Sequence, residues 1–449
     1  MGRLFGTDGI RGEANRAPMD GPTGLALGRA LGGILRKSEK PFKVVLGKDT
    51  RISGDMLASA VAAGIASAGG TVLHAGVIPT PGVAFLVRSL GAQAGVMISA
   101  SHNPFQDNGF KVFTSRGMKL SDAEEAELEA GILSDAEPAD GVQPFEIGRV
   151  EDLENAAQTY MDFLAGAFPE GLTLGGLRLV LDTANGAASA VAPGVFKTLG
   201  AEVEVLHNQP DGVNINRDCG SEHTGALEEQ VRKSGARAGL AFDGDADRLI
   251  AVDETGRRLT GDQVLMILAS DLHERGLLAD SLLVTTVMSN LGLVEACRAM
   301  GISHHAAGVG DRFVLEDMRR LGAVLGGEDS GHMILLDHHT TGDGILSGLM
   351  LLACAVRKGK PLSELAAVMK VFPQELINVE VSGKPDIQTI PEVRRAVREV
   401  ESELGEKGRV LVRYSGTQNI CRVMVEGPTL EVTRNACERI AEAVGKALG

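Results

Sequence analysis

The sequence predicts an α/β protein: three similar α/β domains in series plus a smaller C-terminal α+β domain, arranged around a central cleft. Three observations predict this class. The 449 residues are enough for roughly three domains or more. Short apolar runs alternate with amphipathic helical segments, which is typical of parallel sheets that are covered on both faces. This strand–turn–helix–strand pattern occurs three times, so we expect three domains of similar construction.

Each copy of the pattern has an apolar strand, a polar turn rich in glycine, a helix and a second strand. The first copy spans residues 43–47, 55–68 and 71–74, the second spans 179–182, 190–199 and 202–206, and the third spans 282–287, 292–300 and a strand near Ile302. Further apolar strands are expected at 94–98, 238–242 and 249–252. The turn residues differ between the copies, so each copy can carry a different part of one site.

The end of the chain has another order of elements. We expect strands at 377–381, 410–413 and 420–425, with helices at 393–403 and 430–448. Acidic, proline-containing or glycine-containing stretches suggest the boundaries between domains. They divide the chain into residues 1–153, 154–254, 255–368 and 369–449.

Charge and composition narrow the range of partners. The net charge is −15 and there is no tryptophan, so a nucleic acid or a membrane surface is not an expected partner. A phosphorylated small molecule in a local cationic pocket is compatible with this charge. The five cysteines are scattered without a CxxC pair, which indicates buried thiols in a reducing compartment. No apolar run has a signal-peptide or membrane-spanning length, and we expect a cytoplasmic protein.

The first chemical cluster is Asp243-Gly-Asp-Ala-Asp-Arg248, which follows an apolar strand. Carboxylates at alternate positions of an extended segment point to one side, where they repel one another unless a cation neutralises them. Their hard oxygen atoms suit Mg²⁺ or Ca²⁺. An EF-hand is disfavoured because Arg248 stands where that loop requires glycine and a strand follows. A solvated acidic turn is the remaining alternative.

The second cluster is Ser99-Ala-Ser-His-Asn-Pro104, after the strand at 94–98. The carboxyl end of a parallel strand is where α/β sheets place ligands. Ser101 is therefore a candidate nucleophile or phosphoryl carrier, with His102 beside it. A serine or asparagine that caps a turn is the alternative. The chain has no G-x-S-x-G motif, so the usual signature of an α/β-hydrolase is missing.

Two further loops contain groups that bind phosphates or hydroxyls. The first contains Arg413, Ser415, Gly416 and Thr417, with Arg422 on the next strand, and its donors could converge on a phosphate dianion. A plain hairpin turn is the alternative. The second, at 327–332, places Glu328, Ser330 and His332 at alternate positions, which could bind sugar hydroxyls.

Other familiar motifs are missing. The chain has no P-loop, and Gly308-Val-Gly310 lacks the third glycine of a dinucleotide-binding loop because Phe313 stands there. The histidine pairs at 304–305 and 338–339 have neither the helical spacing nor the cysteine partners of a zinc site. ATP, NAD and a zinc site at these histidine pairs are therefore disfavoured.

Together, the four clusters resemble the α-D-phosphohexomutase superfamily, whose phosphoserine, metal, sugar and phosphate loops follow in this order. The resemblance extends from Phe5 to the C-terminus. It includes four more segments: FGTDGIRG at 5–12, GKDTRISG at 47–54, SNLGL at 289–293 and TTGDG at 340–344. Within the superfamily, these segments are most similar to the members that act on glucosamine phosphates.

The resemblance implies a role for each cluster. Ser101 would be the phosphoserine, and its phosphoryl oxygen would join Asp243, Asp245 and Asp247 in binding Mg²⁺. Five residues near the transferring phosphoryl group would bind it or move protons: Arg11, His102, Lys111, Arg248 and His332. Glu328 and Ser330 would bind the sugar. In the last domain, the phosphate that does not react would be bound by Arg413, Ser415, Gly416, Thr417 and Arg422.

The implied activity interconverts glucosamine 6-phosphate and glucosamine 1-phosphate through a sugar 1,6-bisphosphate, which also serves as activator. A phosphomannomutase or phosphoglucomutase with the same mechanism is the main alternative. A non-catalytic phosphosugar-binding protein and a serine hydrolase are others. The resemblance also allows for a homodimer. Two positions depart from the family pattern: Gln418-Asn419 replaces Glu-Pro, and Asp329 stands where glutamine is usual among the glucosamine-phosphate enzymes.

Overall fold

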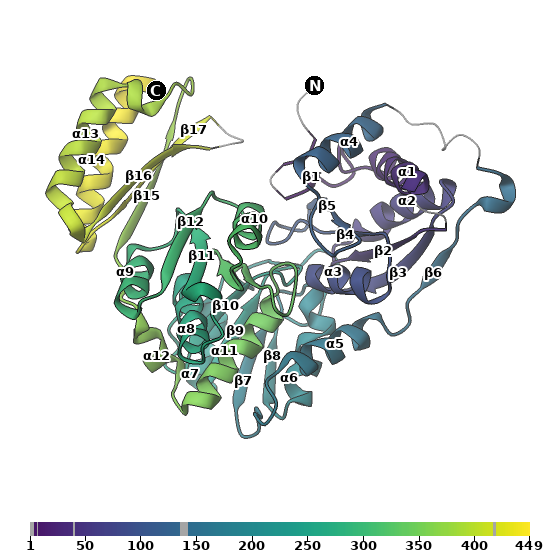
Figure 1. The fold of residues 1–449 in the computed structure, drawn as a ribbon, viewed down its shortest axis with the longest axis horizontal. Coiled ribbons are helices and arrows are strands. Elements are labelled where there is room, and N and C mark those ends of the chain that lie inside the picture. Colours follow the sequence, from purple (N-terminus) through teal and green to yellow (C-terminus); the bar gives the residue numbers. More distant parts are fainter. Residues whose placement is uncertain (1–3, 7, 39–40, 135–141, 416–418) are drawn as a thin grey trace. The chain divides into compact units, whose positions relative to one another are not determined.

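The computed structural model of the chain describes residues 4–6, 8–38, 41–134, 142–415 and 419–449. It confirms the predicted α/β class (Figure 1). The chain forms two compact units, one of residues 1–287 with 302–367 and one of residues 288–301 with 368–449. The first unit contains three sheets and the second contains one. No helix within the described residues is both long and apolar enough to cross a membrane.

The first sheet has six strands in the order β1-β5-β4-β2-β3-β6. Helices α1, α2 and α4 cover one face, where Val44, Val96 and Phe110 join the apolar core. Helix α3 covers the other face, as the contact of Val83 with Gly47 shows. The strands are β1 Ile10–Glu13, β2 Lys43–Lys48, β3 Thr71–Val77, β4 Ala94–Ile98, β5 Asp107–Thr114 and β6 Val150–Asp152, and the helices are α1 Gly21–Ser38, α2 Gly54–Ser67, α3 Thr80–Ser89 and α4 Asp122–Leu133.

The second sheet has the order β10-β9-β7-β8. Adjacent residues of β9 face opposite helices: Ala241 lies in the core cluster with Leu227 of α7, and Leu240 contacts Gly348 of α11. The elements that precede or form this sheet are α5 Ala156–Ala167, β7 Arg178–Asp182, α6 Ala192–Thr198, β8 Glu202–Leu206, α7 Gly225–Ser234, β9 Ala238–Phe242 and β10 Leu249–Asp253.

The third sheet has the order β12-β11-β13-β14. Val314 and Met318 of α10 pack on Val284 of β11 in one core cluster. The elements of this part are α8 Gly261–Glu274, β11 Leu282–Thr286, β12 Ser303–Ala307, α10 Asp311–Leu321, β13 Leu325–Gly327, β14 Met333–Leu335, α11 Gly344–Lys358 and α12 Leu362–Leu365.

The second unit has an antiparallel sheet in the order β15-β17-β16, with α13 and α14 packed on one face (Figure 1). Helix α9, which lies between β11 and β12 in the sequence, belongs to this unit. The elements are α9 Leu291–Met300, β15 Gln374–Glu380, α13 Pro391–Leu404, β16 Arg409–Tyr414, β17 Ile420–Glu426 and α14 Leu430–Leu448.

The sheets of the first unit are mixed, whereas the sequence predicted parallel ones. β5, β10 and β14 each run antiparallel to the strand before them, β4, β9 and β13. A short connection can return a chain only antiparallel, because a parallel strand needs a crossover of a dozen or more residues. The three connections are residues 99–106, 243–248 and 328–332, which are the loops that carry the Ser101 cluster, the acidic cluster and the sugar-loop candidates. The phosphate-loop candidate likewise joins the antiparallel strands β16 and β17.

Candidate active site

Ser101 lies in the loop between β4 and β5 and is almost fully buried. Its φ of 53° lies in the left-handed region, which non-glycine residues rarely adopt and which is common at functional sites. The hydroxyl Oγ donates a hydrogen bond to Asp243 Oδ2 at 2.5 Å and lies 3.4 Å from His102 Nδ1. The phosphoserine candidate therefore points at the acidic loop of the second sheet, 142 positions away in the chain.

Two side chains from distant parts of the chain hold the serine loop. Arg51, 1% exposed, pairs with Asp49 at 2.9 Å and donates to the carbonyls of Ser101 and Asn103, at 2.9 Å each, and to that of Pro104. Asn216 donates to the Ser101 and Asn103 carbonyls at 2.8 and 2.9 Å. We did not predict a role for either residue. The only local signal is Asp49, two residues before the arginine and able to neutralise it.

Asp243, Asp245 and Asp247 come together as predicted, but not through an extended segment. The loop turns sharply, with φ of 56° at Ala246, and brings one oxygen of each carboxylate within 4.8 Å of the others. All three side chains are buried, and Oδ1 of Asp245 and of Asp247 has no hydrogen-bond partner in the described chain. Burial, with repulsion from Asp247 and Asp245, raises the pKa of Asp243 well above its usual value. These residues can hold a metal ion.

Lys111 is the buried counter-ion of the acidic loop. Its Nζ lies 2.8 Å from Asp245, 3.1 Å from Asp247 and 3.2 Å from Asp8. Burial lowers the pKa of this ammonium, but the attraction of the three carboxylates outweighs burial, and the pKa lies well above its usual value. Asp8 also pairs with Arg11. Pairing of β1 with β5, which places Arg11 opposite Gly109, explains why residues near the N-terminus reach this site.

The loop between β13 and β14 completes the group in the first unit. His332 Nδ1 lies 3.8 Å from Asp247, and its Nε2 lies 3.4 Å from Asp311. Burial lowers the pKa of His332, but the two carboxylates outweigh burial and raise it overall. Burial raises the pKa of Glu328, whose Oε1 accepts a hydrogen bond from Gly310 N at 3.1 Å. The hydroxyl of Ser330 is buried without a described partner.

Arg248 and His102 lie on the same network of charges. Burial lowers the pKa of Arg248, but the carboxylates of Asp247 and Asp243 raise it overall. Burial, with the charges of Arg248 and Arg11, lowers the pKa of His102.

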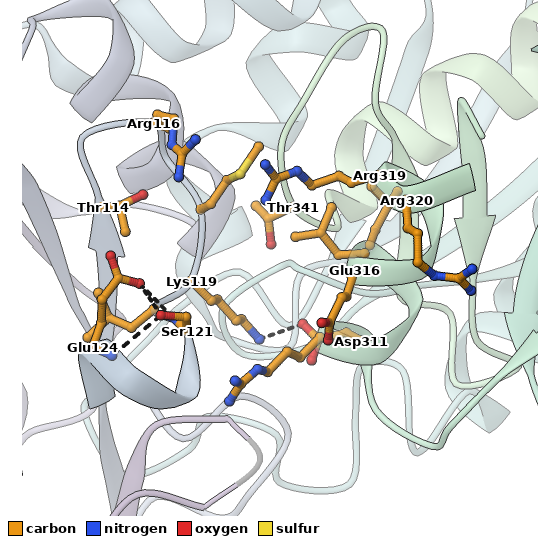
Figure 2. A pocket seen from close by; sticks show the side chains of 15 residues that line it. Thr114, Arg116, Lys119, Ser121, Glu124, Asp311, Glu316, Arg319, Arg320 and Thr341 are labelled. Carbon is orange, nitrogen blue, oxygen red and sulfur yellow. Dashed lines mark hydrogen bonds and ion pairs between the residues drawn. The ribbon is translucent and has the colours of Figure 1, made fainter. Parts of the chain in front are cut away.

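Sequence reasoning missed an ion-pair chain behind these residues. Lys119 pairs with both Asp8 and Asp311, the first residue of α10, at 2.5 Å for Asp311. Lys119 and Asp311 both line a cavity of about 420 Å³, and Figure 2 shows the Lys119 side chain pointing toward Asp311. Separations of more than a hundred residues along the chain leave no local signal for this chain of contacts.

The phosphate-loop candidates lie in the second unit. Arg413 of β16 stands directly opposite Arg422 of β17. Burial, with the charge of Arg422, lowers the pKa of Arg413, so the pair favours an anion between its guanidinium groups. Ser415 is buried and its N–H donates to the carbonyl of Ile420 at 2.8 Å. Gly416 and Thr417 lie outside the described residues.

Four family models match the chain in order. They describe the phosphoglucomutase/phosphomannomutase α/β/α domains I, II and III, at residues 2–139, 158–256 and 260–372, and the C-terminal domain at 376–443. The chain belongs to this family of phosphosugar mutases, the phosphohexomutases.

Curated relatives are similar over their whole length. The phosphoglucosamine mutase of Syntrophobacter fumaroxidans is 56% identical over 450 residues, and that of Syntrophus aciditrophicus is 51% identical over 449 residues; in both cases all of each chain is covered. A family protein of solved structure, from Burkholderia thailandensis, has a TM-score of 0.83 at 25% identity and covers 99% of this chain and 97% of its own. An Aspergillus fumigatus N-acetylphosphoglucosamine mutase, with a TM-score of 0.71 at 18% identity over 99% of this chain and 96% of its own, shares the fold.

Proposed function

We propose that the chain is a phosphoglucosamine mutase that interconverts glucosamine 6-phosphate and glucosamine 1-phosphate, with phosphorylated Ser101 as the phosphoryl carrier. One observation carries this proposal: the buried hydroxyl of Ser101 lies 2.5 Å from Asp243, in a loop of three buried carboxylates. The full-length curated relatives support the substrate class. The reaction serves the synthesis of amino-sugar nucleotides, and the reduced, buried cysteines agree with a cytoplasmic enzyme.

Mg²⁺ is the cofactor that these residues fit. Three carboxylates are hard oxygen donors, and two of their buried oxygens have no described hydrogen-bond partner, which is a donor set in need of a cation. Asp243, Asp245 and Asp247, with the phosphorylated Ser101, would hold the ion. When bound, Mg²⁺ would supply positive charge beside the transferring phosphoryl group.

The chain's own residues position both ends of the substrate. In the first half-reaction the phosphorus–oxygen bond at Ser101 breaks and a bond forms from phosphorus to O1 of glucosamine 6-phosphate. Of the two candidates, Lys111 and His332, the imidazole of His332 would accept the O1 proton, because three carboxylates keep the Lys111 ammonium protonated. The leaving Ser101 oxygen takes up a proton in turn. The resulting 1,6-bisphosphate turns round and returns its 6-phosphoryl group to Ser101. Positioning and neutralisation of charge dominate such transfers. Arg11, His102 and Arg248 surround the group, Glu328 and Ser330 bind hydroxyls, and Arg413, Ser415, Gly416, Thr417 and Arg422 bind the distal phosphate.

The four-domain division at 1–153, 154–254, 255–368 and 369–449 belongs to the same proposal. The spans of the four family models support it, since each falls largely within one of these ranges. A homodimer stays an expectation.

Ser101→Ala tests the mechanism. We expect mutase turnover to fall by several orders of magnitude with an unchanged circular dichroism spectrum, because the carrier hydroxyl is gone. The protein should also fail to take up labelled phosphate from a sugar 1,6-bisphosphate. The control is Ser115→Ala, an exposed serine on the following hairpin. Turnover close to that of the control in Ser101→Ala would rule out the phosphoserine.

Phosphoglucomutase or phosphomannomutase activity is the second candidate function, because Asp329 stands where glutamine is usual among the glucosamine-phosphate enzymes. The residue is exposed, and its Oδ1 accepts a hydrogen bond from Asp262 N, in the first turn of α8, at 3.1 Å. It therefore fixes the sugar loop to that helix. Turnover of the 6-phosphates of glucosamine, glucose and mannose, with Mg²⁺ and a trace of bisphosphate, separates the candidates. We expect glucosamine 6-phosphate to be turned over fastest. Faster turnover of glucose 6-phosphate or mannose 6-phosphate would identify that sugar phosphate as the substrate instead.

A further inference from the structure

Three side chains outside the active site bring different metal-binding atoms together. Asp182 ends β7, His207 follows β8, and Cys219 lies in the loop that follows. One carboxylate oxygen, one imidazole nitrogen and the thiol sulfur all lie within 4.8 Å of one another. Parallel pairing of β7 with β8, which sets Asp182 opposite Leu206, brings the first two residues to the same sheet edge. The mutase reaction uses none of the three.

The aspartate is held in place by the backbone. Its Oδ1 accepts a hydrogen bond from Ala184 N at 2.9 Å, and its Oδ2 accepts one from Gly220 N at 3.0 Å. The side chain is fully buried, as is that of Cys219. Its position therefore does not depend on the histidine, and the carboxylate is prepared for a further partner.

The histidine and the aspartate are in close contact. His207 Nδ1 lies 3.0 Å from Asp182 Oδ2, yet Nδ1 is buried and makes no hydrogen bond of acceptable geometry within the described chain. Two ligands of one ion lie at about this separation, because metal bonds of roughly 2.0–2.2 Å in tetrahedral directions place their ends a little over 3 Å apart. The ring nitrogen and the carboxylate oxygen therefore already have about the spacing of two ligands of one ion.

The surrounding loops are unusually strained. Of the ten described non-glycine residues with positive φ, five lie between positions 184 and 218: Ala184, Asn185, His207, Asn216 and Asp218. Such conformations persist only where the surroundings enforce them.

We propose that Asp182, His207 and Cys219 form a second metal site, which takes a borderline-soft divalent ion of the Zn²⁺ class. Imidazole and thiolate select such ions over Mg²⁺, which prefers oxygen ligands. Three protein ligands leave a fourth position for water, and the partly exposed side chain of His207 provides access from solvent.

Binding at this site would stabilise the loops that support Ser101. Asn216, three residues before Cys219, donates to the Ser101 and Asn103 carbonyls, and Asn185 accepts a hydrogen bond from Thr50 at 2.6 Å. The site is therefore a structural brace, and its existence does not depend on which sugar phosphate the protein converts.

Cobalt(II) titration of the full-length protein tests the proposal. The protein is first treated with a chelator and then given excess Mg²⁺ to fill the Asp243–Asp247 loop. A Co²⁺–thiolate bond gives an intense charge-transfer band in the near ultraviolet, which an oxygen-only site cannot give. We expect this band to saturate at one Co²⁺ per chain, to disappear on addition of Zn²⁺ and to be absent in Cys219→Ser.

Matched variants separate this site from others. His207→Gln should weaken Co²⁺ binding by more than the roughly 10–100-fold that changes outside the ligand shell cause. Cys354→Ser, which alters another buried thiol of the first unit, should leave the band unchanged, and so should Asp243→Asn. If wild-type protein shows no band with excess Co²⁺, or if Cys219→Ser or His207→Gln keeps it at full affinity, the three side chains are not a metal site. The wild-type titration and His207→Gln decide the question even if Cys219→Ser fails to fold.

Discussion

At the scale of the residue, Arg51 is a buried cation with several separate partners. It neutralises Asp49 and ties down three carbonyls of the loop that carries Ser101. Arginine can do this because its guanidinium presents five donors in a fixed plane, whereas lysine has three donors on one atom. The side chain touches no reacting atom, so we assign it as a positioning residue that keeps Ser101 in its left-handed conformation.

Arg51→Lys should therefore lower kcat more than it raises KM. A displacement of about 1 Å in a reacting group can cost on the order of a hundredfold, and we expect a loss of that size with a measurable fall in phosphate uptake by Ser101. Steady-state kinetics with glucosamine 6-phosphate and labelled bisphosphate check both quantities. The control is Arg16→Lys, an exposed ion pair with Glu13. Unchanged kcat in Arg51→Lys would show that the hydrogen bonds from Arg51 to the serine loop are not needed for turnover.

Asp343 gives a prediction about pH and stability. It is buried at the start of α11, accepts hydrogen bonds from Leu346 N and from Tyr160 Oη at 2.9 and 2.6 Å, and burial raises its pKa to about 6. Because this pKa lies above the unfolded value near 4, the folded state binds more protons between pH 4 and 6, and this group's contribution to stability falls as the pH rises through that window. Above pH 6 this loss is complete, and it lowers the free energy of unfolding by on the order of 3 kcal/mol.

Asp343→Asn should remove this cost, since the amide oxygen can still accept from Leu346 N. We expect the melting temperature of the variant, relative to wild type, to rise as the pH increases from 4 to 7. Calorimetry across that range measures the difference. Asp317→Asn is the contrasting variant: hydrogen bonds from Arg320 and His305 lower the pKa of this partly exposed aspartate, so its loss should show the opposite trend. A difference independent of pH for Asp343→Asn would contradict the assignment.

At the scale of the element, local patterns predicted most of the described strands but fewer than half of the described helices. The helix at 430–448 has the bounds that periodicity predicted, and α2 differs from its prediction by one residue at each end. The strand at 249–252 was expected in a parallel sheet but runs antiparallel as β10, because apolar strands alone do not reveal how short the connection between them is. The antiparallel strands β5 and β14 were not predicted as strands. The Ser101 and Asp243 loops could be predicted as candidate sites because they directly follow apolar strands. Asp8, Lys119 and Asp311 could not be predicted as site residues, because only contacts between distant parts of the chain bring them to the site.

The contact between α1 and α2 rests on two glycines. A Cβ on Gly64 would lie 2.3 Å from the Leu25 carbonyl oxygen and 2.8 Å from Gly28 Cα, so the two helix backbones touch. Gly64→Ala should force the helices apart, at a cost of about 1–3 kcal/mol or more. Gly33→Ala, in the same pair of helices, meets no atom within 4 Å and should stabilise by up to about 1 kcal/mol through helix propensity. Calorimetric melting should give shifts of opposite sign, and shifts of equal sign would exclude this packing.

At the scale of the whole molecule, the order of the elements along the chain does not match their assignment to the two compact units. Helix α9 follows β11 and precedes β12, both of which belong to the first unit, yet it belongs to the second. The repeat in the sequence predicted α9 as the crossover helix of the third domain. Its contacts explain the difference: Asn290, at its N-cap, bonds to both N and O of Phe372, Leu291 N donates to Glu426, and Arg409 donates to the Ser289 carbonyl. Such long-range contacts leave no mark on hydrophobic periodicity.

These contacts predict how α9 loses its structure. In native-state hydrogen exchange at increasing guanidinium concentration, cooperative units open together. The backbone amides of α9 should therefore lose protection together with those of α13, α14 and β17, although β11 and β12 flank α9 in the sequence. Peptides from β11 and β12 are the internal control, since the parallel pairing of these strands should keep them with the first unit. Glu426→Gln, which replaces the carboxylate that accepts from Leu291 N, should shift the opening of α9 to lower denaturant and leave β11 unchanged. If α9 instead lost protection together with β11 and β12, it would unfold as part of the third domain, as its position in the sequence predicted. The contacts of Asn290 and Glu426 would then not hold α9 in the second unit.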